Sequence, residues 1–193
     1  MFNGIAFIGL KAAGKDTFLD YIVSQVPRII VLRTKTPLVE AYEKIVGHPY
    51  EKARDDAELM FYSRTKLRPE NPNIVVDYLN TAVPEALAKN RSIPVIPDLR
   101  FLIEADMCYD SLNMFCIRIE TSLETRKKRI IARDGDLQNF NPEDPTEVEI
   151  PLMRSHYTID NEMAFDSRAM SRFRSLVEAK IPGLTPARGV FGT

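Results

Sequence analysis

The sequence predicts a single α/β domain built around a mostly parallel β-sheet. Its 193 residues are enough for one well-buried core and leave little chain for a second domain. Apolar runs of strand length alternate with longer stretches that could be helical, as repeated strand-helix-strand units require. A glycine-containing turn joins the first apolar run to the first amphipathic stretch.

The first unit is a strand, a turn and a helix. Residues 4–9 (GIAFIG) read as an apolar strand, and a helix follows from about residue 15 to residue 26. The apolar face of this helix carries Phe18, Leu19, Ile22 and Val26. A second buried strand is predicted at residues 28–32 (RIIVL).

A long helical insert separates the second strand from the third. Helices are predicted at residues 37–46, 52–67 and 73–89. Pro37 suits the first turn of a helix, where a missing N–H costs no hydrogen bond. The third strand is predicted at residues 93–97 (IPVIP), with ends weakened by two prolines that cannot donate to a sheet ladder.

The last third of the chain supplies two more strands and a long polar segment. Strands are predicted at residues 113–119 and from residue 157 to about 159, with helices at about 123–133 and 165–180. Between them, residues 134–152 are rich in Asp, Glu, Asn and Pro, and loops of this length are usually lids or disordered. The tail after residue 180 contains Pro and Gly and is predicted to be irregular.

The overall composition excludes several classes of function. Lys and Arg together number 26 against 27 Asp and Glu, so no global charge favours binding to nucleic acid or a membrane surface. Cys108 and Cys116 lack partners at zinc-site spacing and are expected to be buried, reduced thiols. Without a basic leader or an apolar stretch of about 18 residues, the protein is expected to be soluble and cytoplasmic.

A phosphate-binding loop is predicted between the first strand and the first helix. The segment GLKAAGKDT matches the pattern G-x-x-x-x-G-K in the strand-to-helix context that the pattern requires. Its glycines allow successive backbone N–H groups to point at phosphate oxygens beside a positive helix N-terminus. The candidate nucleotide-binding residues are Gly9, Lys11, Ala12, Ala13, Gly14, Lys15, Asp16 and Thr17.

Charge neutralisation at this loop is assigned to Lys15 and to magnesium. Lys15 is expected to reach the β and γ phosphates of ATP. Magnesium is normally held in part by a hydroxyl after this lysine, but Asp16 stands there and Thr17 follows. Asp16 and Thr17 are therefore the candidate metal residues, with Asp16 binding directly or through water and Thr17 free to bond a phosphate.

Two further groups of residues favour phosphoryl transfer over simple nucleotide binding. Arg126, Arg129 and Arg133 are three and four residues apart, so they share one helix face and are candidate catalytic cations beside a lid. The alternative is a solvated basic face. Asp98 follows the third strand, where ligands of parallel sheets gather, and can orient magnesium or polarise an acceptor.

Basic residues outside the loop and the predicted lid are candidates for binding an acceptor that already carries a phosphate. Arg100 lies two residues beyond Asp98 and can grip such a phosphate through two hydrogen bonds, unless it forms a surface ion pair with Glu104. The further acceptor candidates are Arg33, Lys35, Arg64 and Arg68.

Several separate stretches resemble the deoxynucleoside monophosphate kinase family, whose P-loop enzymes are best known from bacteriophages. The resemblance spans roughly residues 4–172 and includes the GKDT ending of the loop. The other similar stretches are TPLVEAYEKIVG, AELMFYSRTKLRPENPNIVVDYL, IPDLRFLIEAD and YTIDNEMAFDSRAM, the last carrying an Ile-x-Asn motif. The chain departs from the family at Ser63-Arg64-Thr65, at Val76 in place of a tryptophan and at Val39 in place of a lysine.

This resemblance implies a three-layer P-loop fold with five parallel strands in the order 2-3-1-4-5. It implies transfer of a phosphoryl group from ATP, with Mg²⁺, to a deoxynucleoside monophosphate, and homodimers occur in the family. Lys15, Asp16 and Thr17 would serve the donor and magnesium, whereas Arg68, Asp98 and Arg100 would serve the acceptor. The departures fall on the acceptor side and concern base specificity.

The resulting prediction is one kinase domain with an acceptor-binding insert at about residues 37–90 and a lid at about 134–152. Transfer would be a direct in-line displacement without a covalent enzyme intermediate, and lid closure would exclude water. Two alternatives stay open: another small-molecule kinase, such as a dephospho-coenzyme A or phosphomevalonate kinase, and a nucleotide-binding protein without an acceptor.

Overall fold

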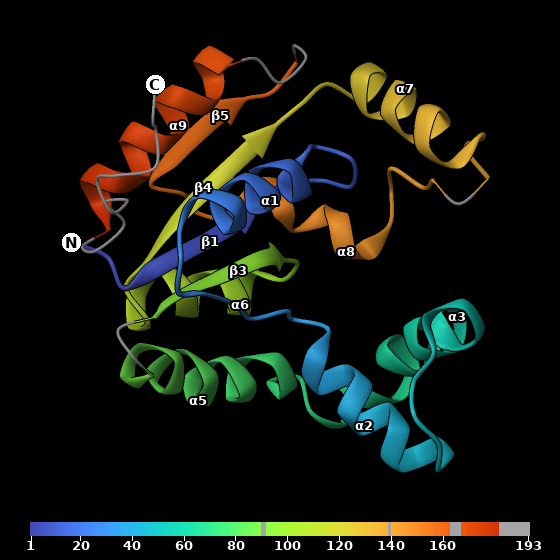
Figure 1. The fold of residues 1–193 in the computed structure, drawn as a ribbon. Coiled ribbons are helices and arrows are strands. Elements are labelled where there is room, and N and C mark those ends of the chain that lie inside the picture. Colours follow the sequence, from blue (N-terminus) through green and yellow to red (C-terminus); the bar gives the residue numbers. More distant parts are fainter. Residues whose placement is uncertain (90–91, 139, 163–166, 182–193) are drawn as a thin grey trace.

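The computed structural model describes residues 1–89, 92–138, 140–162 and 167–181, and its ribbon is drawn in Figure 1. The predicted irregular tail and the predicted start of the last helix at residue 165 lie outside these residues. Within the described chain, no helix is both long and apolar enough to cross a membrane.

Five parallel strands form the central sheet. They are β1 (Gly4–Ile8), β2 (Ile29–Val31), β3 (Ile93–Leu99), β4 (Met114–Glu120) and β5 (Tyr157–Asp160). Their order is β2-β3-β1-β4-β5, which confirms the predicted order 2-3-1-4-5. All five carboxyl ends therefore meet at one edge of the sheet.

Both prolines of the third strand lie inside β3, which reaches two residues beyond the predicted end. The residues on either side of Pro94 keep the ladder intact. The Ile93 N–H donates to the Arg28 carbonyl, and the Val95 carbonyl accepts from the Leu32 N–H, both at 2.9 Å. The prolines remove donors locally without ending the strand.

Helices cover both faces of the sheet, which confirms the three-layer architecture (Figure 1). One face packs on α1 (Lys15–Gln25) and α9 (Ser167–Lys180), whose Phe18 and Phe173 rings lie 4.8 Å apart. The opposite face packs on α2 (Thr36–Val46), α5 (Ile74–Ala88) and α6 (Leu102–Asp106). Cys108 and Cys116 are free, buried thiols in this second core, as predicted.

The helical insert is broken where the sequence predicts one long helix. The segment α3 ends earlier than predicted (Lys52–Tyr62), and the chain continues as a π-helical turn, Ser63–Leu67, and the short α4 (Arg68–Glu70). Pro69 explains the change, because its ring would clash with the carbonyl four residues earlier in a regular α-helix. The wider turn relieves that clash, with Arg68 N–H bonding to the Ser63 carbonyl.

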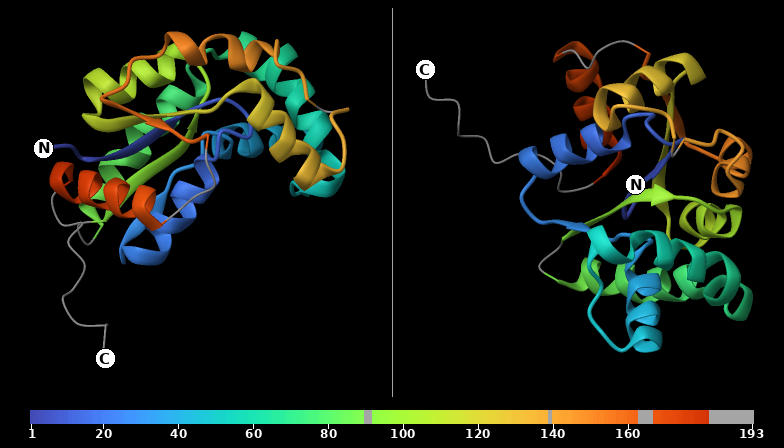
Figure 2. Two further views of the ribbon diagram at one scale, coloured as in Figure 1. Left: turned by 90° about the horizontal axis from the view of Figure 1, so that it is seen from above. Right: turned by 90° about the vertical axis from the view of Figure 1, so that its right-hand side faces the viewer.

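The predicted lid contains regular structure. After α7 (Leu123–Asp134), the polar segment forms the short helix α8 (Pro145–Val148) and a single 3₁₀ turn at Ile150–Leu152. Ile150 and Met153 anchor this segment because both are buried in the core beneath it. Seen edge-on, the sheet has α7 on one side of its carboxyl edge and the helical insert on the other (Figure 2).

Candidate phosphate loop and acceptor pocket

The loop between β1 and α1 has the backbone shape of an anion nest. Ala12 and Gly14 adopt positive φ angles of 63° and 103°, and alternation of such residues with ordinary ones turns successive N–H groups inward. A Cβ atom on Gly14 would lie 2.3 Å from Asn161 Nδ2, and one on Gly9 would lie 2.8 Å from the Ile119 carbonyl oxygen. Only glycine fits these two positions.

Lys15 begins α1 and points back across the loop. Its ammonium donates to the Gly9 carbonyl at 2.6 Å and to the Leu10 carbonyl at 3.2 Å, and lies 3.6 Å from Asp98 Oδ1. Burial lowers the pKa of Lys15, and the nearby Asp98 carboxylate opposes that shift. This placement brings Lys15 and Asp98 from different elements to one point at the mouth of the loop.

Three donors hold the Ala13 carbonyl on the outer side of the loop. Asn161 Nδ2 donates to it at 2.7 Å, while Thr121 Oγ1 and Arg129 Nη1 each donate at 3.1 Å. Arg129 also donates to the Asn161 carbonyl at 2.6 Å. The residues that follow β4 and β5 thus fix the loop. The sequence predicts this role for neither residue, although Asn161 belongs to the Ile-x-Asn motif of the resemblance.

The structure separates the three arginines of α7. Arg126 and Arg129 lie against the loop, but Arg133 forms a two-pronged ion pair with its neighbour Asp134 at 2.7 Å and is 56 % exposed. Arg126 is buried, and its Nε has no hydrogen-bond partner among the described residues. Such a spare buried donor is the kind of group that a phosphate oxygen would satisfy.

Sequence reasoning missed Glu147, which lies on α8 and is only 4 % exposed. Its carboxylate accepts a short hydrogen bond from the Lys11 backbone N–H and another, at 2.9 Å, from Arg126. Arg100 Nη1 lies 3.5 Å from the same group. Nothing in the sequence distinguishes Glu147 from its many acidic neighbours in the lid.

A cavity lies between the phosphate loop, where Lys11 lines it, and the helical insert. Its volume is ≈ 560 Å³. Lys35, Arg64, Arg68, Asp98 and Arg100 line it, as the acceptor prediction requires. Arg33, also predicted for the acceptor, is exposed and lies outside this lining.

At the inner end of this acceptor pocket, Asp98 and Arg100 form an ion pair of 2.9 Å. The alternative pairing of the Arg100 guanidinium with Glu104 is wrong. Glu104 Oε2 instead accepts from the Arg100 backbone N–H at 3.0 Å, and Glu104 Oε1 pairs with Arg68 at 2.9 Å. Burial raises the pKa of Glu104, and the charge of Arg68 opposes that shift.

The outer end of the pocket is held by ion pairs between more exposed groups. Lys35 donates to Tyr50 at 2.7 Å and forms a close ion pair with Asp56, which also accepts from Tyr50 at 2.8 Å. Arg64 of the insert reaches Asp144 of the lid at 2.8 Å. The last contact links the two segments predicted to enclose the acceptor.

Magnesium fits at this site chemically. Asp98 Oδ1 is buried and accepts no hydrogen bond from the described residues, although Arg100 Nε lies 2.9 Å and the Lys15 ammonium 3.6 Å from it. A carboxylate oxygen of this kind can accept from a metal-bound water. Asp16 and Thr17 are exposed at the start of α1. The described residues contain no group of three or more metal-ligating side chains, so phosphate oxygens and waters would have to complete the coordination.

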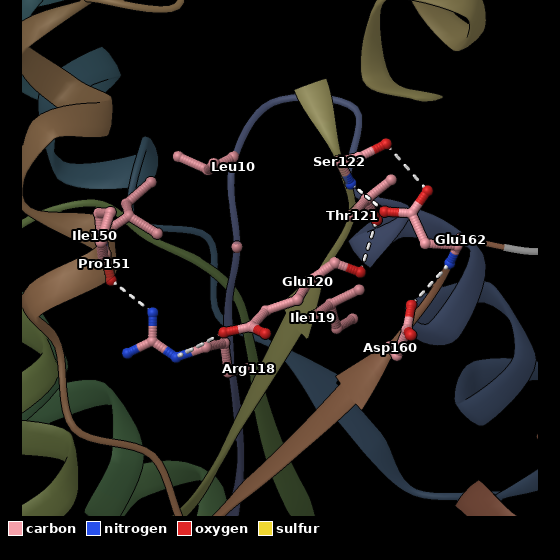
Figure 3. Close-up of a pocket in the computed structure, with 11 residues that line it drawn as sticks. Leu10, Arg118, Ile119, Glu120, Thr121, Ser122, Ile150, Pro151, Asp160 and Glu162 are labelled. Carbon is pink, nitrogen blue, oxygen red and sulfur yellow. Dashed lines mark hydrogen bonds and ion pairs between the residues drawn. The ribbon is translucent and has the colours of Figure 1, made fainter. Parts of the chain in front are cut away.

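A separate hollow of ≈ 390 Å³ is lined by Leu10 and by the ends of β4 and β5 (Figure 3). Glu120, Asp160 and Glu162 line it, and Arg118 is the single cation among the described residues that line it. Arg118 is already bonded to the Ile150 carbonyl at 2.8 Å. This excess of carboxylates disfavours phosphate binding there, in contrast to the acceptor pocket.

Comparisons with solved structures agree with the fold. The chain has the fold of small-molecule P-loop kinases. A shikimate kinase from Acinetobacter baumannii, in complex with shikimate, matches with a TM-score of 0.53 and 15% identity over 93% of this chain and 94% of that one. A dephospho-CoA kinase from Campylobacter jejuni matches with a TM-score of 0.51 and 16% identity over 94% and 98%.

A sugar kinase from Janibacter sp. matches with a TM-score of 0.59 and 10% identity over 97% of this chain and all of that one. No protein-family model and no curated protein matches the sequence. At these identities the likeness concerns the fold, so the phosphoryl acceptor has to be argued from the pocket itself.

Proposed function

We propose that this protein transfers the γ-phosphoryl group of ATP to a deoxynucleoside monophosphate. The observation that carries the proposal is the meeting of Lys15 and Asp98 at the point where the phosphate loop opens into a pocket lined by five basic side chains. These are Lys11, Lys35, Arg64, Arg68 and Arg100, and four carboxylates line the same pocket. A nucleotide-binding protein without an acceptor would have no need of a second pocket with so many basic side chains.

The donor side would work by positioning and electrostatics. Backbone N–H groups of the loop and the Lys15 ammonium would hold the phosphates of ATP, and Arg126 would add a charge-assisted hydrogen bond from the lid side. Arg129 would act through the loop by bracing the Ala13 carbonyl. Mg²⁺, held through Asp98, Asp16 or Thr17, would supply charge neutralisation on the phosphate oxygens.

The acceptor side would hold the monophosphate at its inner end and the nucleoside at its outer end. Arg100 is the best-placed phosphate ligand because its guanidinium is fixed next to Asp98, within the region that Lys15 reaches. Asp98 would then fix the Arg100 guanidinium, and Arg100 would orient the attacking oxygen of the monophosphate. Transfer would be in line, with no covalent intermediate on the protein.

A second kinase function, phosphorylation of dephospho-coenzyme A, has one specific observation in its favour. The dephospho-CoA kinase from Campylobacter jejuni covers nearly the whole chain in three dimensions. The pocket favours the smaller acceptor, because the ion pairs of Arg64 with Asp144 and of Lys35 with Asp56 span it and a larger acceptor would have to open both. Its volume of ≈ 560 Å³ lies in the usual range for a small-molecule site.

A coupled assay of ADP release tests these proposals against each other. The panel should contain the four deoxynucleoside monophosphates, their ribose counterparts, dephospho-coenzyme A and phosphomevalonate. We expect turnover with at least one deoxynucleoside monophosphate. Turnover with dephospho-coenzyme A or phosphomevalonate alone would replace the acceptor assignment, and nucleotide binding without turnover of any acceptor would replace the enzyme assignment.

A further inference from the structure

The buried carboxylate of Glu147 lies among the groups that would bind a phosphate. It accepts a hydrogen bond from the backbone N–H of Lys11, a residue of the phosphate loop. Arg126 donates to its other oxygen at 2.9 Å, and Arg100 Nη1 lies 3.5 Å away. One loop amide and two guanidinium groups are the kind of donor set that recognises a phosphoryl group.

The position of Glu147 bears on the transfer reaction. Glu147 lines the acceptor pocket together with Lys11, Asp98 and Arg100, so its carboxylate stands at the junction of the loop and the pocket. The terminal phosphate of ATP has to reach this junction to meet an acceptor. Two negatively charged groups cannot share one donor set without a large cost in free energy.

We propose that Glu147 engages the donors that would bind a phosphoryl group and competes for them with the terminal phosphate of ATP. The proposal rests on ATP binding at the loop, as proposed above. ATP would displace the carboxylate, take over the Lys11 N–H and Arg126, and free α8 from the loop. Arg126 has a second buried donor, Nε, without a hydrogen-bond partner among the described residues, which a phosphate could also satisfy.

A bracing role for Glu147 makes the opposite prediction. If Glu147 only held the loop and Arg126 in shape, removing its charge would loosen the site and weaken ATP binding. If Glu147 competes with phosphate, removing its charge strengthens ATP binding, although the empty protein becomes less stable because Arg126 loses its buried partner. The sign of the change in ATP affinity therefore separates the two roles.

The test is titration calorimetry of ATP with Mg²⁺, without acceptor, on the full chain. We expect Glu147→Gln to bind ATP at least about fivefold more tightly than wild type, because a like charge is removed from the site. Glu149→Gln is the matched control: this carboxylate lies in the same lid segment and accepts from a backbone N–H at 2.6 Å, but that N–H belongs to Leu102 outside the loop. Its ATP affinity should equal that of wild type.

Unchanged or weaker binding by Glu147→Gln, with binding by wild type intact, would overturn the competition alone. Absence of binding by both proteins would overturn the proposed function as well. A second measurement avoids any loss of folding in the variant: a crystal structure of the wild-type chain with a non-hydrolysable ATP analogue. There, Glu147 should have left the Lys11 N–H, and a carboxylate still bonded to it would refute the proposal.

Discussion

The two halves of the site differ in how they are held. Around the phosphate loop, the contacts are buried and involve the backbone: three donors fix the Ala13 carbonyl, and Lys15 spans two loop carbonyls. Around the outer acceptor pocket, side chains are joined by more exposed ion pairs, such as Lys35 with Asp56 and Arg64 with Asp144. Buried backbone ties enforce one geometry, whereas exposed ion pairs add little stability and can rearrange around a ligand.

This comparison predicts large effects on the loop side and progressively smaller ones toward the pocket rim. The largest is expected for Lys15→Ala, which removes the charge proposed to meet the transferring phosphoryl group. Turnover should fall by at least about two orders of magnitude. Steady-state kinetics with a saturating acceptor measures the effect, and Lys128→Ala is the control because Lys128 is 72 % exposed in a surface pair. Activity of Lys15→Ala within tenfold of wild type would contradict the donor assignment.

The next largest effect is expected on stability, from Gly14→Ala. An alanine there must adopt a φ of 103° and would bring its Cβ within 2.3 Å of Asn161, so we expect a loss of about 2–3 kcal/mol in the free energy of unfolding. Gly47→Ala separates the two causes, since Gly47 also has a positive φ, of 78°, but has open space around it. Denaturant unfolding of both variants gives the comparison. Equal losses would show that the contact with Asn161 adds nothing.

A smaller effect, confined to the acceptor, is expected for Arg100→Ala. Its KM for the monophosphate should rise by about tenfold, because a charge-assisted contact is lost, while the KM for ATP changes much less. Arg33→Ala is a control of matched chemistry because Arg33 lies outside the pocket lining, and it should leave both constants unchanged. Equal rises in both constants for Arg100→Ala would place this arginine on the donor side as well.

The smallest effect is expected at the pocket rim. A double-mutant cycle with Arg64→Ala and Asp144→Ala should give a coupling free energy below about 1 kcal/mol in thermal or chemical unfolding, as is usual for exposed pairs. A coupling free energy above about 2 kcal/mol would show that the ion pairs of the outer pocket hold it as firmly as the buried contacts hold the loop.

Local sequence patterns were sufficient for the sheet and the loop. Four of the five strands contain a short apolar run, whereas β5 (YTID) is mostly exposed, and the glycine positions 9 and 14 reveal a turn that only glycine allows. These features depend on neighbours in the chain, so periodicity and motif spacing detect them. The π-helical turn at Ser63–Leu67 was missed because helical patterns do not distinguish a widened turn from a regular one.

The chain's sequence alone determined the parallel sheet, the glycine loop after the first strand and the set of basic residues proposed for the acceptor, because backbone preferences and residue spacing are local properties. Tertiary structure decided which charges meet. It directed Arg126 and Arg129 to the loop and Arg133 to Asp134, left Arg33 outside the pocket, and brought Glu147 back to Lys11 across 136 positions. Charge pairing over such separations depends on how the helices pack on the sheet, which no local pattern records.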